Sequence, residues 1–159
     1  MKAREIGRLV TELNRLYADN WPEADFQGVL YDSTDKLVNR QSPAFSNTIH
    51  QIARHLLGTD RMVTERLRGV AYQLSEEENW PSADSLQDIP WSVTVEELLR
   101  RRDVLVEEVS RLDEDVLDRP ILEGYSTVYA TLQGHIQHVY YHTGQMVVIK
   151  KALERRPSL

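Results

Sequence analysis

The chain has 159 residues, of which 41% are hydrophobic and 28% are charged, and this balance predicts a single globular domain over residues 1–159. A net charge of -6 argues against nucleic acid as a partner, and the lack of a long apolar run or a signal-peptide core argues against a membrane, so we expect a cytoplasmic location. The absence of cysteine excludes disulfides, thiolate zinc sites and a cysteine nucleophile.

The first forty residues predict one helix and an irregular connector. Apolar residues at three- and four-residue spacing indicate an amphipathic helix over residues 3–17, and Asn20-Trp21-Pro22 interrupts it. A weaker apolar pattern follows over residues 25–38, where Asp32-Ser33-Thr34-Asp35 divides it into short pieces. Glycine (7) and proline (6) are scarce, which favours long helices in the rest of the chain.

Three further long helices are expected. The second long helix is predicted over residues 47–70, with Ser46 or Asn47 as its N-cap. Residues 75–92 are too long for a tight hairpin, so we interpret them as a crossover that lets the next helix run parallel to the previous one. A capping box at Thr94-Val95-Glu96-Glu97 predicts the third helix over residues 94–112.

The last helix is expected to follow Ser126 or Thr127 and to end near Glu154, and it carries the most informative spacing in the chain. His138 and His142 stand four residues apart, so their imidazoles project from one helix face and can converge on a single cation. His135 shares this face but lies roughly 10 Å from His142 along the helix axis. One ion therefore takes either His138 with His142 or His135 with His138.

The second helix offers a third imidazole. His55 lies on its predicted core face, where a buried histidine needs partners for its nitrogens, and a metal shared with the last helix would supply one. His50 cannot serve the same site, because five residues correspond to about 140° around a helix, and we expect it to be exposed. Three neutral imidazoles with an open position are typical of a reactive divalent-metal site. The competing interpretation is that these histidines pack as neutral polar core residues.

Other polar residues give weaker signals. Gln145 can hydrogen-bond a ligand or bound water, one turn after the histidine pair. Gly144 costs about 1 kcal/mol in a helix interior relative to alanine, which close approach of a neighbouring helix would justify. Asp60 and Glu123 are the carboxylates considered as a general base, and neither is convincing.

The segment His138-Val-Tyr-Tyr-His142-Thr-Gly144-Gln145 resembles the last-helix signature of the DinB-like (YfiT-like) metalloenzymes, in which His-x-x-x-His is followed by x-Gly-Gln. Thr48-Ile49 leading to His55-Leu-Leu57 resembles the second-helix segment that carries their third histidine. Three other segments also resemble this superfamily: Asn79-Trp80-Pro81, residues 94–112, and Thr127-Val-Tyr129 before Leu132-Gln-Gly134. The similarity covers residues 45–153.

The resemblance implies an all-α, up-down-down-up four-helix bundle with the long crossover between the second and third helices. It makes His55, His138 and His142 the ligands of one divalent ion, which is zinc or nickel in relatives. His135 stands where relatives often have an aliphatic residue, so it is either an extra polar group that lines the pocket or a harmless variant. With Gln145 it is the candidate for a residue behind the ligands or in the pocket. Some members resemble S-transferases or isomerases that use small thiols such as bacillithiol, and homodimers are common.

The leading hypothesis is a metal-dependent enzyme that transfers a small thiol to an electrophile or hydrolyses another small-molecule substrate. A divalent ion favours either reaction, because its Lewis acidity makes water or a thiol a better nucleophile at neutral pH. The alternative is a non-catalytic metal-binding or scaffold bundle with a stress-related role, in which the ion ties helices together.

Overall fold

The structure is a computed structural model that describes residues 4–18 and 26–155, and within these ranges the regular secondary structure is helical apart from one isolated β-bridge between Pro120 and Thr127. The all-α prediction is therefore confirmed. The helices, with η marking a 3₁₀-helix, are α1 (Glu5–Arg15), α2 (Phe26–Tyr31), α3 (Asp35–Val38), α4 (Ile49–Leu67), α5 (Glu76–Asn79), η1 (Asp84–Leu86), α6 (Trp91–Ser110), η2 (Glu114–Val116) and α7 (Val128–Glu154). The expected break at Asn20-Trp21-Pro22 lies outside the described residues.

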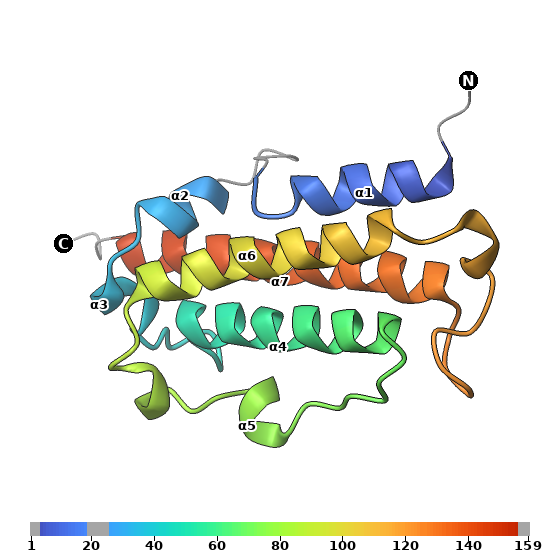
Figure 1. The fold of residues 1–159 in the computed structure, drawn as a ribbon. Coiled ribbons are helices and arrows are strands. Elements are labelled where there is room, and N and C mark those ends of the chain that lie inside the picture. The colour runs from blue at the N-terminus through green and yellow to red at the C-terminus, as the bar shows by residue number, and fades with distance from the viewer. Residues whose placement is uncertain (1–3, 19–25, 156–159) are drawn as a thin grey trace.

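Four long helices, α1, α4, α6 and α7, lie side by side (Figure 1). In this view α4 and α6 run in one direction along the molecule, while α1 and α7 run in the opposite direction. Residues 68–90, which we call the crossover, join the C-terminal end of α4 to the N-terminal end of α6 and include α5 and η1. In the described ranges no helix combines the length and apolar character that crossing a membrane requires.

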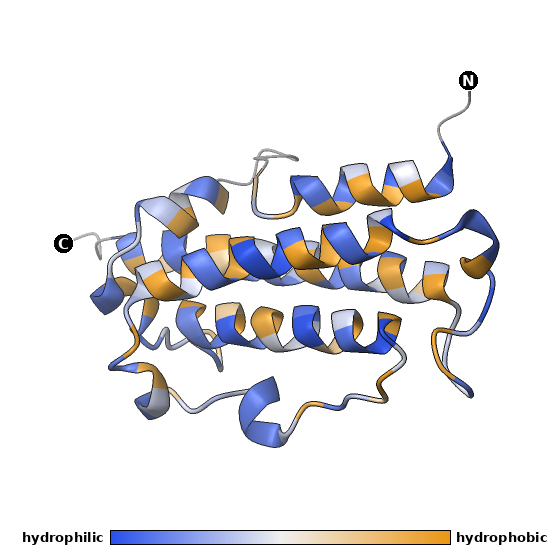
Figure 2. Ribbon diagram, viewed as in Figure 1, coloured by the Kyte–Doolittle hydropathy of each residue, from blue (hydrophilic) through white to orange (hydrophobic). Residues whose placement is uncertain are grey.

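In Figure 2 the apolar side of α1 faces the other long helices and its polar side faces outward. Helix α4 packs against both α6 and α7, and α1 packs mainly against α6. Each large side chain that is withdrawn from water here contributes roughly 1.5–3 kcal/mol of hydrophobic free energy. The largest fully buried apolar side chains are Leu9, Leu13, Leu16, Ile49, Leu56, Leu98, Leu105, Leu132, Met146 and Ile149.

The N-cap of helix α4 lies one residue after Asn47 and two after Ser46, the two caps that the sequence suggested. Thr48 is the cap: its hydroxyl accepts from the Gln51 backbone N–H at 3.2 Å, and the Gln51 side chain accepts from the Thr48 N–H at 3.0 Å. This reciprocal capping box satisfies two backbone donors that the helix start leaves unpaired. The Gln51 amide also donates to the carbonyl of Pro81 at 2.9 Å, which attaches the crossover to α4.

The capping box predicted at Thr94 is wrong. The helix begins at Trp91, and the Asp35 carboxylate at the start of α3 accepts from the Trp91 backbone N–H at 2.6 Å. The Trp91 indole N–H donates to the carbonyl of Leu30 at 2.9 Å. Thr94 lies inside the helix and is fully buried. A carboxylate distant in the sequence thus supplies the cap that local reasoning gave to Thr94.

The prediction that His50 is exposed is wrong. Its ring is fully buried between α3, α4 and α6, with Nδ1 at 3.0 Å from Asn39 Oδ1 and Nε2 at 2.8 Å from Thr94 Oγ1. Both nitrogens are therefore used in structural hydrogen bonds, and the ring also meets Trp91 edge-on, with centroids 5.5 Å apart. Burial, followed by the nearby Arg54 charge, lowers the pKa of His50 to about 4, so the ring is neutral at pH 7.

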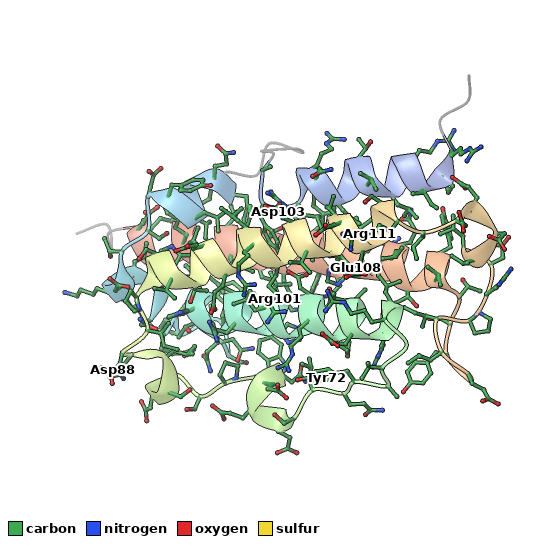
Figure 3. All side chains as sticks on the ribbon, viewed as in Figure 1. Tyr72, Asp88, Arg101, Asp103, Glu108 and Arg111 are labelled. Atoms are coloured by element: carbon green, nitrogen blue, oxygen red, sulfur yellow. The ribbon has the colours of Figure 1, made fainter. Side chains whose placement is uncertain are left out.

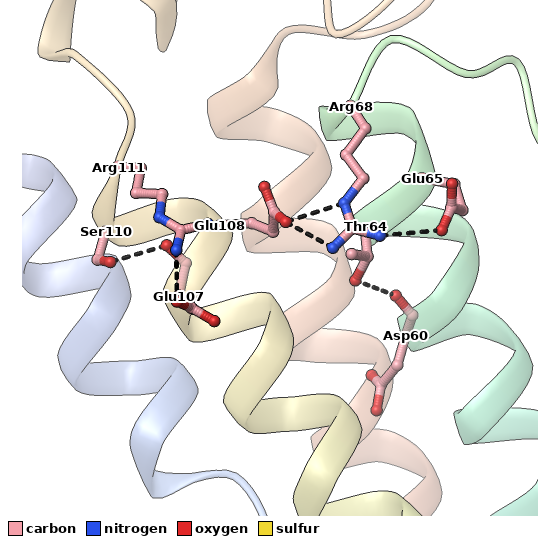
Figure 4. A network of polar contacts seen from close by, with 8 residues as sticks. All are labelled: Asp60, Thr64, Glu65, Arg68, Glu107, Glu108, Ser110 and Arg111. Carbon is pink, nitrogen blue, oxygen red and sulfur yellow. Dashed lines mark hydrogen bonds and ion pairs between the residues drawn. The ribbon is translucent and has the colours of Figure 1, made fainter.

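A polar network joins the C-terminal ends of α4 and α6 (Figure 4). Arg68 donates to the Glu108 carboxylate through Nε at 2.8 Å and Nη2 at 2.6 Å, and to Glu65 at 3.2 Å. These side chains are partly exposed, so each pair contributes about 1 kcal/mol at most. The network links the C-terminal ends of α4 and α6, in addition to the Arg54–Glu97 ion pair between the same two helices.

Helix α7 follows the prediction most closely. Thr127, one of the two expected caps, accepts from the Ala130 N–H at 3.1 Å, and the helix runs to Glu154 as expected. Its 27 residues span the bundle and hold His135, His138 and His142 against α4.

Candidate metal centre

Three histidines meet where α7 crosses α4. One ring nitrogen each of His55, His138 and His142 lies within 4.8 Å of the other two. The ring centroids are 5.0 Å apart for His55 and His138, 4.8 Å for His55 and His142, and 4.5 Å for His138 and His142. The helix-turn spacing of the α7 pair and the inward face of α4 thus bring together the three histidines singled out from the sequence.

The crossover fixes the tautomer of His55. Its Nδ1 lies 2.8 Å from the backbone carbonyl of Asn79, and a carbonyl oxygen only accepts. Nδ1 therefore carries the proton, and the lone pair of Nε2 faces the other histidines. The Trp80 indole stacks on the His55 ring with centroids 4.0 Å apart and an interplanar angle of 5°, which restricts rotation of the ring.

Gln145 fixes the tautomer of His142. The Gln145 Oε1 accepts from His142 Nδ1 at 2.7 Å, and the Gln145 amide donates to the Tyr141 hydroxyl at 3.0 Å. The lone pair of His142 Nε2 is left for the centre of the cluster. The predicted place of Gln145 beside the site is thus refined: its side chain orients an imidazole from behind.

His138 shows why the cluster suits a cation. Its Nε2 lies 3.0 Å from His55 Nε2, which carries no proton, so this contact requires either a proton on His138 or a cation between the two nitrogens. Imidazole nitrogens bound to one tetrahedral zinc ion at 2.0–2.1 Å are about 3.3 Å apart. The donor spacing and the donor chemistry therefore fit a divalent ion that prefers imidazole.

The histidines are neutral at pH 7, as metal ligation requires. Burial lowers the pKa of all three, and for His138 the neighbouring imidazoles of His142, His55 and His135 add to the effect and bring its pKa to about 4. His55 and His142 are almost fully buried, whereas His138 is half-buried. The Tyr141 ring, 63% exposed, lies beside His142. Of the three histidines, His138 is therefore the one with the most contact with solvent.

His135 neighbours His138 but is not one of the three converging imidazoles. Its Nε2 is 2.7 Å from the Asp60 carboxylate, and both side chains are 2% exposed. His135 lies about one turn before His138 on α7. Because α4 and α7 run in opposite directions, this turn of α7 lies beside the part of α4 that follows His55, where Asp60 stands. Of the two pairs that the sequence left open, the structure brings His138 and His142 together with His55.

The Asp60 carboxylate is enclosed in the core beside His135. The carboxylate is buried against His135, and with burial its charge raises the pKa of the fully buried Tyr17 hydroxyl. A carboxylate enclosed in this way cannot accept a proton from a molecule at the histidine cluster. Asp60 is therefore part of a polar island in the core.

A family model described as the DinB superfamily matches residues 19–146. The chain belongs to the DinB superfamily. The matched span includes His55, His138, His142 and Gln145. No curated protein and no solved structure matches the chain.

In this DinB-superfamily chain the glycine that matters for the site is Gly58, which the sequence reading missed. A Cβ at Gly58 would lie 2.9 Å from the carbonyl oxygen of Glu78, so only glycine lets the crossover approach α4 this closely. The contact places Asn79 over His55. The expected close approach at Gly144 is wrong, because a Cβ there would have no neighbour within 4 Å.

Trp80 and Tyr141 were also missed as parts of the site. The signal for Trp80 was the Asn79-Trp80-Pro81 segment, which carried part of the family resemblance without indicating a contact to His55. Tyr141 precedes His142, and neighbouring positions on a helix face different directions, so no spacing rule links its hydroxyl to the histidines. Gln145 makes that link.

Proposed function

We propose that this DinB-superfamily protein holds one divalent ion, zinc or nickel, between His55, His138 and His142 and acts as a metal-dependent enzyme. One observation carries the proposal: three neutral imidazoles from two helices converge, and hydrogen bonds from Asn79 and Gln145 turn the lone pairs of two of them toward the same point. Zinc and nickel are borderline ions that imidazole binds well.

The proposed reaction is transfer of a small thiol to an electrophile, or hydrolysis of a small molecule. When bound, the ion supplies Lewis acidity. The residues of the chain do the rest: Asn79 and Gln145 hold two imidazoles in the ligating tautomer, while Trp80 covers one side of the cluster. The exposed Tyr141 hydroxyl, held by Gln145, forms the rim at which a substrate would enter.

The metal content of protein made without a histidine tag tests the proposal. Metal-free protein titrated with Zn²⁺ or Ni²⁺ should bind one equivalent, and His138→Ala should lose tight binding. His135→Gln is the matched control, because it removes a nearby imidazole on the same helix and should still bind one equivalent. Circular dichroism confirms that each variant is folded. Unchanged affinity in folded His138→Ala would refute the site.

A second function is favoured by one feature of the cluster, which spans three parts of the fold: α4, α7 and, through Asn79, the crossover. An ion here would tie these parts together, as in a metal-stabilised scaffold protein. Loading with Co²⁺ separates the two functions. If adding 2-mercaptoethanol changes the Co²⁺ visible spectrum, the ion has an open position, as the enzyme requires; an unchanged spectrum favours the scaffold.

The proposal extends to an up-down-down-up four-helix bundle that forms a homodimer in the cytoplasm. The helix directions in Figure 1 support the bundle. A surface groove of about 550 Å³ has a mixed lining, and its apolar residues, among them Leu30, Tyr31, Val95 and Leu99, offer a contact for a second copy. Light scattering on the purified protein checks the dimer, and a monomer at micromolar concentration would contradict it.

A further inference from the structure

One cavity that none of the three converging histidines lines has the crossover as one of its walls. It encloses about 380 Å³ between α4, α6 and the crossover, a volume within the range of small-molecule sites. The α4 side is the stripe Arg54, Leu57, Gly58 and Arg61, whose spacing places these residues on one helix face. His55 does not line this cavity.

Part of the cavity wall is apolar and part is charged. Leu57, Leu86, Ile89 and Pro81 give it an apolar side. The charged side holds three arginines, Arg54, Arg61 and Arg101, and three glutamates, Glu77, Glu78 and Glu97. The formal charges cancel, so a multiply charged anion gains no net attraction from the wall.

The pairing of these charges leaves one guanidinium for a ligand. Arg54 forms an ion pair with Glu97, and Arg61 forms one with Glu78 at 3.2 Å. Arg101, on α6, is half-buried, and its side chain has no ion pair or hydrogen bond with any residue in the described ranges. Figure 3 shows it between α6 and α4. Glu77, on the exposed rim, accepts from the Ser85 hydroxyl at 3.1 Å.

We propose that this cavity binds a small monocarboxylic acid with an apolar body, distinct from any ligand of the histidine cluster. The guanidinium fork of Arg101 receives the carboxylate in two parallel hydrogen bonds, the geometry that arginine favours. Leu57, Leu86 and Ile89 receive the apolar part. The volume limits the ligand to a small aromatic or branched acid.

Benzoate, with neutral benzamide as its match, is the probe for this site. In ¹H–¹⁵N spectra of the full chain, benzoate should shift the amides of Gly58 and Leu86 saturably, with a Kd below about 1 mM. Arg101→Gln should weaken benzoate binding about tenfold or more, because a charge-assisted hydrogen bond is lost. Arg100→Gln removes the same charge from an exposed neighbouring position and should leave binding unchanged.

His138→Ala separates this proposal from the metal centre, because it should leave benzoate binding intact even if it abolishes metal binding. Four results would overturn the carboxylate site: equal affinity for benzamide and benzoate, tighter binding of inorganic phosphate, shifts confined to Gln145 and Tyr141, or no saturable shift up to about 20 mM benzoate. A normal Arg101→Gln affinity in a folded variant would overturn the role of that residue.

Discussion

His50 should make the protein less stable as the pH falls from 6.5 toward 4. Burial, with the Arg54 charge second, lowers the pKa of its folded form to about 4, whereas a histidine in the unfolded chain titrates near 6.5. In this window the unfolded chain binds a proton that the folded ring does not, so the free energy of unfolding decreases with decreasing pH. Above pH 6.5 the ring is mostly neutral in both the folded and the unfolded chain, so His50 causes little loss of stability there. Between pH 7 and pH 5 about 2 kcal/mol of it is lost.

Urea unfolding of metal-free protein at pH 7 and pH 5 measures this loss. His55, His138 and His142 also have lowered pKa values, so the wild-type protein should lose more than the share of His50 alone. His50→Gln keeps a donor and an acceptor between Asn39 and Thr94 but does not titrate. Its loss between the two pH values should be smaller than that of the wild type by about 2 kcal/mol.

A control must separate titration from general destabilisation. Val109→Ala removes fully buried methyl groups in α6 while keeping His50, so its stability should fall at both pH values and its pH dependence should match the wild type. If His50→Gln loses as much stability as the wild type between pH 7 and pH 5, the neutral buried state assigned to His50 is wrong.

Three further predictions concern the site and its support. Gly58→Ala should lower the thermal unfolding temperature, since its Cβ would collide with the Glu78 carbonyl. Gly144→Ala should raise the free energy of unfolding by about 1 kcal/mol, and a Gly58→Ala protein more stable than Gly144→Ala would contradict the close approach at Gly58. Gln145→Leu should weaken Zn²⁺ binding about 10–100-fold in a chelator competition, because His142 loses its orienting hydrogen bond, and unchanged affinity would exclude that role. Asp60→Ala should lower the free energy of unfolding, measured in urea, by roughly 3 kcal/mol. A double-mutant cycle with a His135 variant should show coupling between the two side chains, and fully additive effects would mean that the pair does not interact.

The parts of the fold that follow from local spacing were predictable. Period-3.6 apolar patterns located the four long helices within a few residues, and the i, i+4 rule placed His138 and His142 on one face. Thr127 met the N-cap rule because its partner, the Ala130 N–H, is three residues away. Such features depend on atoms separated by about one helical turn, which the sequence alone arranges.

The errors arose where distant segments supply the partner. Asp35 caps α6 from another helix, so the local capping box at Thr94 was misleading. His50 looked exposed because its partners, Asn39 and Thr94, come from two other segments. His135 looked like a pocket residue because its partner, the Asp60 carboxylate, comes from the opposing helix. Each partner becomes visible only when the packing of the helices is known.

The crossover shows the same principle at the histidine cluster, where it contributes contacts of its own. Gly58 allows it to touch α4, and the Gln51 amide holds it through the Pro81 carbonyl. Between these two anchors the Asn79 carbonyl sets the tautomer of His55, and Trp80 stacks on its ring. A substitution that shifts the crossover therefore changes which His55 nitrogen carries the proton, and with it the lone pair offered to an ion, without altering any of the three histidines.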